Sequence, residues 1–238
     1  MAFPFTIVIP TYNEAGGIEK LLRTLDETFR THGLDGEVIV VDDNSPDGTG
    51  AIVDRLSKEL PVRCLHRPGK MGLSSGVIDG WKMARAESVA LGAMDADFSH
   101  DVRALPKMVE AVESGKYGLA VGSRYVPGGG IANWPKRRIV TSRVACWLAR
   151  PLTGVKDVTS GYFLVRRDAL DGITLDPIGF KIGLEVIVKG KYGKAVEVPY
   201  TFTDRIVGES KLNQSEIFNY LKQLRKLYLG RLLHAGAR

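Results

Sequence analysis

The chain has 238 residues, of which 44% are hydrophobic and 25% are charged, with a formal net charge of +6. These values fit a globular protein with one α/β domain, and so mild a basic charge gives no reason to expect a nucleic-acid partner. Cys64 and Cys146 lie far apart and form no CxxC pattern, so we expect two reduced thiols in a cytosolic protein.

The first half of the chain alternates strand and helix patterns. Apolar, often β-branched runs predict strands at residues 6–9, 37–41, 61–66, 88–94 and 117–122. Apolar residues at helical spacing predict helices at residues 18–29, 51–60, 74–86 and 105–114. Near-continuous apolar strands separated by helices are typical of a mostly parallel sheet with helices on both faces, so the expected fold class is α/β.

The pattern changes after about residue 125. Residues 127–130 (Pro-Gly-Gly-Gly) predict a flexible joint, and residues 136–150 carry five basic residues and no acidic one. Further strands are expected at residues 162–166 and 196–202, with a helix that ends at Lys189 between them. The second half therefore continues the fold with a more basic surface.

Residues 215–233 have the pattern of a basic amphipathic helix. Lys222 and Lys226 lie opposite an apolar stripe that consists of Ile217, Leu221, Leu224, Tyr228 and Leu232. Such a helix either rests on an anionic membrane surface or packs against its own core, and the sequence leaves both possibilities open. We expect no membrane-spanning helix, because the longest uncharged stretch, residues 1–13, is shorter than the roughly 20 apolar residues required.

Polar clusters directly follow three of the predicted strands. Because the carboxyl ends of strands in an open α/β sheet form the ligand crevice, we expect these clusters to converge. Mg²⁺ and Mn²⁺ prefer carboxylate oxygens, so Asp95 and Asp97, two residues apart beyond a strand, predict a divalent-cation site. The clusters are Tyr12-Asn13-Glu14, Asp42-Asp43 and Asp95-Ala96-Asp97.

Several other kinds of site are excluded by spacing. No GxGxxG or P-loop pattern follows a strand, and no GxSxG indicates a hydrolase. The four histidines show no zinc-ligand spacing, and His100 is expected to be an ordinary loop residue. Phosphate recognition needs cations. The candidates are Arg124, Arg138, Lys181, Arg205 and Lys211, and the alternative for each is an ordinary surface cation.

Four segments of the chain, taken in order, resemble the family 2 inverting glycosyltransferases. They are Pro10-Thr11-Tyr12-Asn13-Glu14, residues 41–49, Met94-Asp95-Ala96-Asp97 and Gly122-Ser123-Arg124-Tyr125. The chain is similar, more narrowly, to the dolichol-phosphate (polyprenyl-phosphate) mannose synthases. That narrower resemblance rests on Asn133-Trp134-Pro135, Gly179-Phe180-Lys181-Ile182, Lys189-Gly190-Lys191-Tyr192, Glu197-Val198-Pro199 and Gly208-Glu209-Ser210-Lys211. The motifs span nearly the whole chain, and their order makes the set specific.

The resemblance implies a GT-A-type, Rossmann-like catalytic domain in residues 1–212 and an amphipathic membrane-interface helix in residues 213–238. It implies that Asp95, Ala96 and Asp97 engage the diphosphate and one Mg²⁺ or Mn²⁺, with Asp97 as the principal metal ligand. Ser99 stands where close relatives often have Gln, so its shorter side chain would need a water to reach the metal. The implied nucleoside site is Pro10, Tyr12, Glu14, Val41 and Asp43. The implied phosphate contacts are Arg124, Arg138, Lys181, Arg205 and Lys211, with Asp95, Asp97, Arg124 and Arg138 as the catalytic residues.

The implied reaction transfers mannose from GDP-mannose to a dolichyl or polyprenyl phosphate, with inversion. The chain would act as a peripheral protein on the cytoplasmic face of a membrane, alone or with a membrane-anchoring subunit. Three alternatives remain: UDP-glucose as donor to the same lipid, transfer to a polysaccharide or protein, and a non-catalytic nucleotide-sugar-binding module. The Asp95 and Asp97 pair, together with the matched cations, argues against the last.

Overall fold

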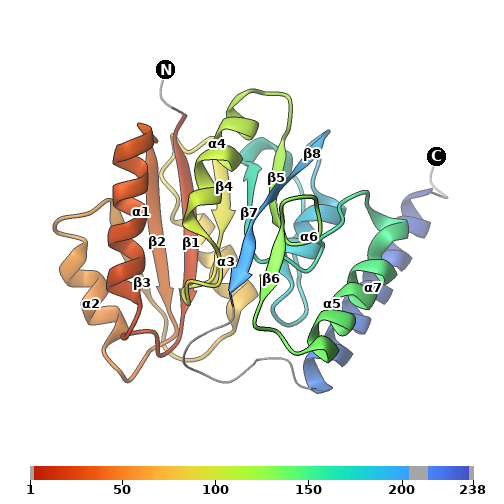
Figure 1. Ribbon diagram of the computed structural model, residues 1–238, viewed down its shortest axis with the longest axis horizontal. Helices are drawn as coiled ribbons and strands as arrows, with labels where there is room; N and C mark the ends of the chain where they lie inside the picture. The colour runs from red at the N-terminus through yellow and green to blue at the C-terminus, as the bar shows by residue number, and fades with distance from the viewer. Residues whose placement is uncertain (1–2, 204–213, 236–238) are drawn as a thin grey trace.

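The apolar runs of the sequence become the strands of one sheet. The computed structural model, which describes residues 3–203 and 214–235, places seven strands in the order β3-β2-β1-β4-β7-β5-β8 (Figure 1). β7 is antiparallel to both of its neighbours, and the other pairs are parallel, which confirms the expected mostly parallel sheet. The strands are β1 (Phe5–Thr11), β2 (Gly36–Asp42), β3 (Val62–His66), β4 (Ala90–Ala93), β5 (Leu119–Ser123), β7 (Phe163–Arg166) and β8 (Ala195–Pro199).

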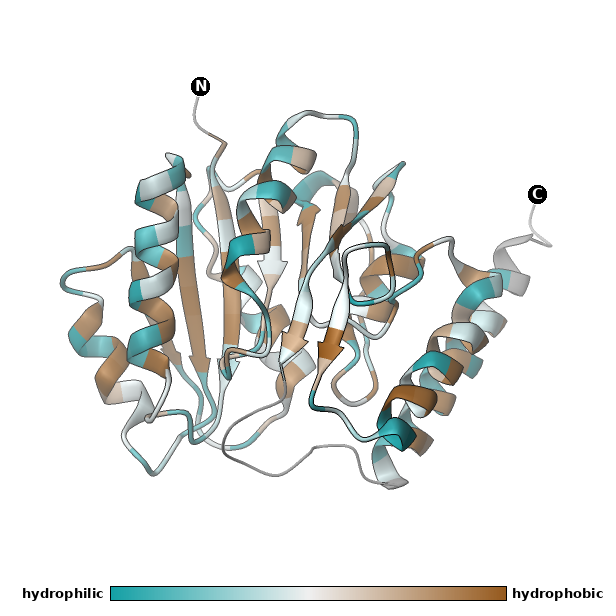
Figure 2. Ribbon diagram, viewed as in Figure 1, coloured by the Kyte–Doolittle hydropathy of each residue, from teal (hydrophilic) through white to brown (hydrophobic). Residues whose placement is uncertain are grey.

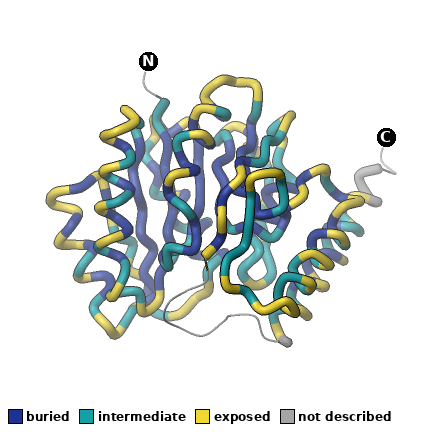
Figure 3. The backbone as a smooth tube through the Cα atoms, in the orientation of Figure 1, coloured by how far each residue is buried: buried dark blue, intermediate teal, exposed yellow. Residues whose placement is uncertain are grey.

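Helices cover both faces of this sheet, as the sequence predicts. One face is covered by α1 (Ile18–His32), α2 (Thr49–Leu56) and α4 (Leu105–Glu113), whose apolar side chains form one core cluster with the sheet. A second core cluster contains side chains of α3 (Leu73–Lys82), α5 (Lys136–Ala149), α6 (Ile182–Lys189) and α7 (Gln214–Ala235). Short 3-10 segments lie at Val102–Ala104, Arg150–Leu152 and Arg167–Leu170. The apolar strands and the buried interior coincide (Figures 2 and 3).

Two sequence predictions are wrong in the second half of the chain. The single strand expected at residues 196–202 divides at Tyr200, because β8 ends at Pro199 and β9 (Thr201–Thr203) pairs with β6 (Gly130–Ala132) in a separate sheet. The glycine run at residues 127–130 is not a flexible joint. Gly130 opens β6, and a Cβ on Gly129 would lie 2.5 Å from the carbonyl oxygen of Ser123, so glycine here permits close backbone packing.

Helix α7 packs against α5 through part of the expected stripe, since Leu224 is buried and Tyr228 contacts α5. Tyr220, Leu224 and Leu227 are buried, whereas Ile217 and Leu221 are exposed. Two tyrosine hydroxyls of α7 donate to main-chain carbonyl oxygens of α5 at 2.6 and 2.7 Å, which ties the two helices side by side (Figure 1). The side chain of Leu232 lies outside the described residues. Within the described part of the chain, no helix combines the length and apolar character that crossing a bilayer requires.

The carboxyl ends of β1, β2 and β4 meet at one edge of the sheet, at the bottom of Figure 1. A non-glycine residue with positive φ follows each of these strands: Asn13 at 60°, Asn44 at 57° and Phe98 at 57°. Such conformations cost free energy and cluster where a protein holds its backbone for function, most clearly for a bulky residue such as Phe98. A functional site is therefore expected at this edge of the sheet.

Candidate active site

A cavity of about 290 Å³ opens beside this edge of the sheet. Five residues that the sequence singles out line it together, although they come from separate segments: Asp95, Asp97, Arg124, Arg138 and Lys181. Helices α5 and α7 also supply apolar lining, which includes Val144, Leu148, Ile217 and Leu221. Glu216 of α7 also lines the cavity, which thus joins three carboxylates, three cations and an apolar surface.

The acidic loop after β4 folds back on itself. The backbone N–H of Ser99 donates to Asp97 Oδ1 at 3.1 Å, and the backbone N–H of Asp95 donates to His100 Nδ1 at 3.0 Å. Ala96 is buried and does not line the cavity. The Ser99 hydroxyl is buried and has no hydrogen-bond partner among the described residues, and Ser99 does not line the cavity.

The carboxylates of this loop have the chemistry that a hard divalent cation needs. Asp95 and Asp97 both reach the cavity, and carboxylate oxygens are the usual protein ligands of Mg²⁺ and Mn²⁺. The orphaned Ser99 hydroxyl is a further oxygen close by in sequence that a water molecule would satisfy. The residues present therefore fit a magnesium or manganese site.

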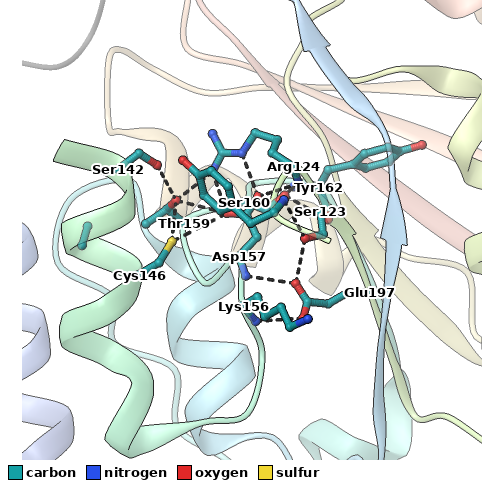
Figure 4. Close-up of polar contacts among 12 residues, drawn as sticks. Ser123, Arg124, Ser142, Cys146, Lys156, Asp157, Thr159, Ser160, Tyr162 and Glu197 are labelled. Carbon is teal, nitrogen blue, oxygen red and sulfur yellow. Dashed lines mark hydrogen bonds and ion pairs between the residues drawn. The ribbon is translucent and has the colours of Figure 1, made fainter. Parts of the chain in front are cut away.

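Arg124 is held from behind by a buried carboxylate (Figure 4). Its Nε and Nη2 donate to the two carboxylate oxygens of Asp157 at 2.7 and 2.6 Å, and Nη2 also donates to Thr159 Oγ1 at 2.7 Å. The Asp157 side chain is 0% exposed, and its backbone N–H donates to Glu197 Oε1. Burial alone would lower the pKa of Arg124, but the ion pair with Asp157 outweighs it and raises that pKa.

Lys181 is a half-buried cation in the cavity wall. Its ammonium lies 3.4 Å from the carbonyl oxygen of Thr159 and 4.2 Å from the centre of the Phe180 ring. Burial lowers the pKa of Lys181 to about 8, with Arg124 adding to the effect and Asp95 opposing it. Arg138, by contrast, stacks its guanidinium 3.9 Å over the centre of the Trp134 ring. Both cations are placed to meet an anion in the cavity.

The predicted nucleoside residues lie on the neighbouring strand ends and do not line this cavity. Asp43 is buried, and its Oδ1 accepts from Arg67 Nε at 2.6 Å. Its Oδ2 accepts from the backbone N–H groups of Met71 and Gly72, both at 3.1 Å. Asp43 therefore holds the loop that follows β3. Pro10, near the end of β1, is half-buried.

Tyr12 is the most open member of this group, with 38% of its surface exposed. The Lys70 ammonium lies 4.3 Å over the centre of its ring. Val41 is fully buried. Glu14 is half-buried, and its backbone N–H donates to Thr49 Oγ1. The remaining two predicted cations, Arg205 and Lys211, lie outside the described residues.

Sequence reasoning missed two residues of the site. His100 is not an ordinary loop residue, because it is buried directly beneath Asp95. Asp157 was missed because its partner, Arg124, is 33 residues away in the chain. A usable signal was present in residues 156–161, where polar residues and a glycine gather just before a strand.

Comparisons with known proteins show the family of this chain. The model of the family "Glycosyl transferase family 2" matches residues 6–174. The dolichol-phosphate mannosyltransferase of Pyrococcus furiosus is 42% identical over 226 residues, which cover 93% of this chain and 63% of that protein. This chain thus spans less than two thirds of that relative. The polyprenol monophosphomannose synthase of Mycolicibacterium smegmatis is 41% identical over 223 residues, which cover 89% of this chain and 82% of that protein.

The fold also matches solved structures. A mannosyltransferase from Pyrobaculum calidifontis, solved in complex with GDP-Man and Mn²⁺, superposes with a TM-score of 0.64 at 16% sequence identity. The match covers 98% of this chain and 65% of that one. Identity this low carries the fold alone, and it confirms the expected GT-A-type arrangement of a mostly parallel sheet with helices on both faces.

Proposed function

This chain belongs to glycosyl transferase family 2, and we propose that it transfers mannose from GDP-mannose to a polyprenyl or dolichyl phosphate with inversion. The observation that carries the proposal is the cavity that Asp95, Asp97 and three cations line together with apolar side chains. A sugar-diphosphate needs the polar part, and a lipid phosphate needs both parts. The names of the two relatives, both polyprenol- or dolichol-phosphate mannose enzymes, favour the same donor and acceptor.

The donor would lie along the carboxyl ends of β1, β2 and β4. Pro10, Tyr12, Glu14 and Val41 are the contacts proposed for the nucleoside, and Asp43 adds its carboxylate or fixes the adjoining loop. The diphosphate would then reach the acidic loop that follows β4. Parallel strands bring these segments to one edge, which is the general place for nucleotides in open α/β sheets.

Asp95 and Asp97 would hold one Mg²⁺ or Mn²⁺, with Ser99 contributing through a water. A cation bound there would neutralise charge on the departing diphosphate. The chain's own part is positioning and charge compensation. Arg124, Arg138 and Lys181 line the cavity and would hold two anionic reactants close together in spite of their repulsion.

The reaction itself needs little from a general base. A lipid phosphate has a second pKa of about 6, so its oxygen is already anionic near neutral pH. That oxygen attacks the anomeric carbon of mannose from the face opposite the nucleotide. A new carbon–oxygen bond forms as the bond to the diphosphate breaks, and its electron pair leaves with GDP. No side chain has to remove a proton from the acceptor.

A membrane surface is the proposed location of the acceptor. Exposed apolar side chains on α5 and α7 adjoin the apolar lining of the cavity, and exposed Lys136, Arg137, Arg143 and Lys222 accompany them. We define the interface patch as Val140, Val144, Trp147, Ile217, Phe218 and Leu221. Apolar side chains with basic neighbours suit an anionic lipid surface, so we propose peripheral binding at the cytoplasmic face, with or without an anchoring subunit.

The decisive experiment offers the purified chain three radiolabelled donors, GDP-mannose, UDP-glucose and UDP-GlcNAc, with a short polyprenyl phosphate and either Mg²⁺ or Mn²⁺. Transfer from GDP-mannose that EDTA abolishes is expected, and the Asp97→Ala variant should lose at least about 10³-fold in rate. Asp101→Asn is the matched control, because Asp101 caps the following 3-10 turn and does not line the cavity. Transfer from UDP-glucose alone would replace the proposed donor, and donor binding without any transfer would indicate a binding module.

A further inference from the structure

His100 is buried, borders the cavity and bonds directly to the acidic loop. It is 2% exposed, and its Nδ1 accepts a hydrogen bond of 3.0 Å from the backbone N–H of Asp95. Because Nδ1 is an acceptor, the ring proton sits on Nε2. Nε2 lies 3.8 Å from Asp95 Oδ2, so the positive edge of the ring faces the carboxylate that lines the cavity.

Three aromatic rings from distant parts of the chain hold the imidazole in place. It stacks on Tyr162, with ring centres 5.0 Å apart and planes 15° from parallel. Tyr200 and Phe202 meet it edge-on at 5.8 and 6.0 Å. Tyr162 immediately precedes β7, whereas Tyr200 and Phe202 lie at the junction of the two sheets. The ring therefore ties the acidic loop to both sheets.

The loop needs such a tie, because its own backbone is strained. Phe98 has a φ of 57°, a conformation that costs a bulky residue free energy. The backbone N–H of Ser99 donates to Asp97 Oδ1 within the turn, and His100 closes the turn through Asp95. Strained residues persist only where their surroundings over-determine them. The two hydrogen bonds hold the backbone of the loop, one at Asp95 and the other at Asp97.

We propose that His100 is a positioning residue for the acidic loop, which sets the Asp95 main chain and carboxylate so that Asp95 and Asp97 present their oxygens together. This inference rests on the proposed function, since it assigns His100 to the cation site of that reaction. Groups that orient metal ligands from behind typically change metal affinity by about 10- to 100-fold when they are removed. His100 also borders the cavity, but its polar contacts are with Asp95, through which we expect it to act.

The test measures Mn²⁺ binding, by electron paramagnetic resonance of the free ion, in wild type, His100→Leu and His100→Asn. Leu fills the space without an acceptor, whereas Asn places an oxygen near the position of Nδ1. We expect a 10- to 100-fold loss of Mn²⁺ affinity in His100→Leu and a clearly smaller loss in His100→Asn. Both variants lose the stacked ring, so the midpoint temperature of thermal unfolding without metal should fall by a similar amount in the two. The control is Tyr162→Phe, which keeps the ring beneath His100 and should bind Mn²⁺ as wild type does.

Equal Mn²⁺ affinity in wild type and both variants would overturn the inference and leave the proposed function standing. A wild type that binds no Mn²⁺ would instead count against the proposed cation site. If His100→Leu does not fold, an NMR measurement on the wild type still tests the inference. The ¹⁵N spectrum of histidine-labelled protein should show a proton on Nε2 of His100 and a coupling between Nδ1 and the Asp95 amide nitrogen. The opposite tautomer, or no coupling, would refute the hydrogen bond on which the inference depends.

Discussion

Arg124 and Asp157 form a two-pronged ion pair inside the protein, with Nε–Oδ2 and Nη2–Oδ1 distances of 2.7 and 2.6 Å. The backbone N–H of Arg124 also donates to Asp157 Oδ2 at 2.9 Å. Within the described part of the chain, the side-chain contacts of Arg124 to Asp157 and Thr159 use Nε and Nη2, which leaves Nη1 for a ligand in the cavity. Asp157 thus fixes the direction in which the guanidinium points.

The Asp157→Asn variant should therefore lose both stability and activity. Removing one charge of a buried pair leaves the other uncompensated, and this typically costs about 3–5 kcal/mol of the free energy of unfolding. We also expect kcat/KM for mannosyl transfer to fall by about 10²-fold, because a misdirected cation no longer compensates the reactants' charge. Urea unfolding and steady-state kinetics measure the two effects. Asp168→Asn is the control, since Asp168 pairs with Arg166 on the exposed surface, where such a pair is worth about 1 kcal/mol or less.

Lys181 should give the reaction an alkaline limit. Burial lowers the pKa of Lys181 to about 8, and only the protonated ammonium attracts phosphate. As pH rises through about 8, the free enzyme loses this charge, so kcat/KM should fall. A bound phosphate favours the charged form, so the fall in kcat should come at higher pH than the fall in kcat/KM.

The control for this pH profile is Lys181→Arg. A guanidinium stays charged over the whole range, so the decline of kcat/KM above pH 8 should disappear even if the overall rate is lower. Lys181→Met should be slow at every pH, because it never carries the charge. An unchanged alkaline decline in Lys181→Arg would assign that decline to another group.

Much of this fold follows from local patterns that act over a few residues. The strands of the first half and the carboxylates at their ends are predictable, because β-branched runs form buried strands and parallel strands bring their carboxyl ends together. Asp95, Asp97, Arg124, Arg138 and Lys181 meet in one cavity as the resemblance implies.

The features that could not be predicted depend on contacts between distant segments. The antiparallel insertion of β7 between β4 and β5 is a matter of topology, which the apolar pattern of a short strand does not encode. The pairing of Arg124 with Asp157 and the burial of His100 against Tyr200 likewise exist only after the chain has folded. The stripe predicted for α7 was right at Leu224 and Tyr228 but missed Tyr220, whose hydroxyl donates to α5, and Leu227.

The interface patch predicts that binding to lipid vesicles depends on its aromatic residues. Trp147 is 71% exposed and Phe218 is 59% exposed, and burying such a side chain is worth about 1.5–3 kcal/mol. The double variant Trp147→Ser/Phe218→Ser should therefore bind vesicles that contain anionic lipid at least about 10-fold more weakly. Flotation through a density gradient measures the bound fraction.

Two comparisons make the vesicle experiment specific. Val89→Ser removes an exposed apolar side chain outside the interface patch and should float as wild type does. Transfer to a short, water-soluble polyprenyl phosphate should be nearly unchanged in the double variant, because neither Trp147 nor Phe218 lines the cavity. If wild type and double variant float equally, the patch is not the membrane contact; if neither floats, an anchoring subunit becomes the route to the membrane.

Gly118 provides a stability prediction that is independent of the site. It immediately precedes β5, and a Cβ at this position would lie 2.3 Å from the carbonyl oxygen of Tyr192. Backbone atoms cannot turn aside as a flexible side chain does, so Gly118→Ala must push two segments apart. Overpacking of this kind typically lowers the free energy of unfolding by about 1–3 kcal/mol. Gly154→Ala is the matched control, because a Cβ there meets no atom within 4 Å, and it should leave the urea midpoint unchanged or slightly higher. Equal midpoints for Gly118→Ala and wild type would contradict the close approach of Gly118 to Tyr192.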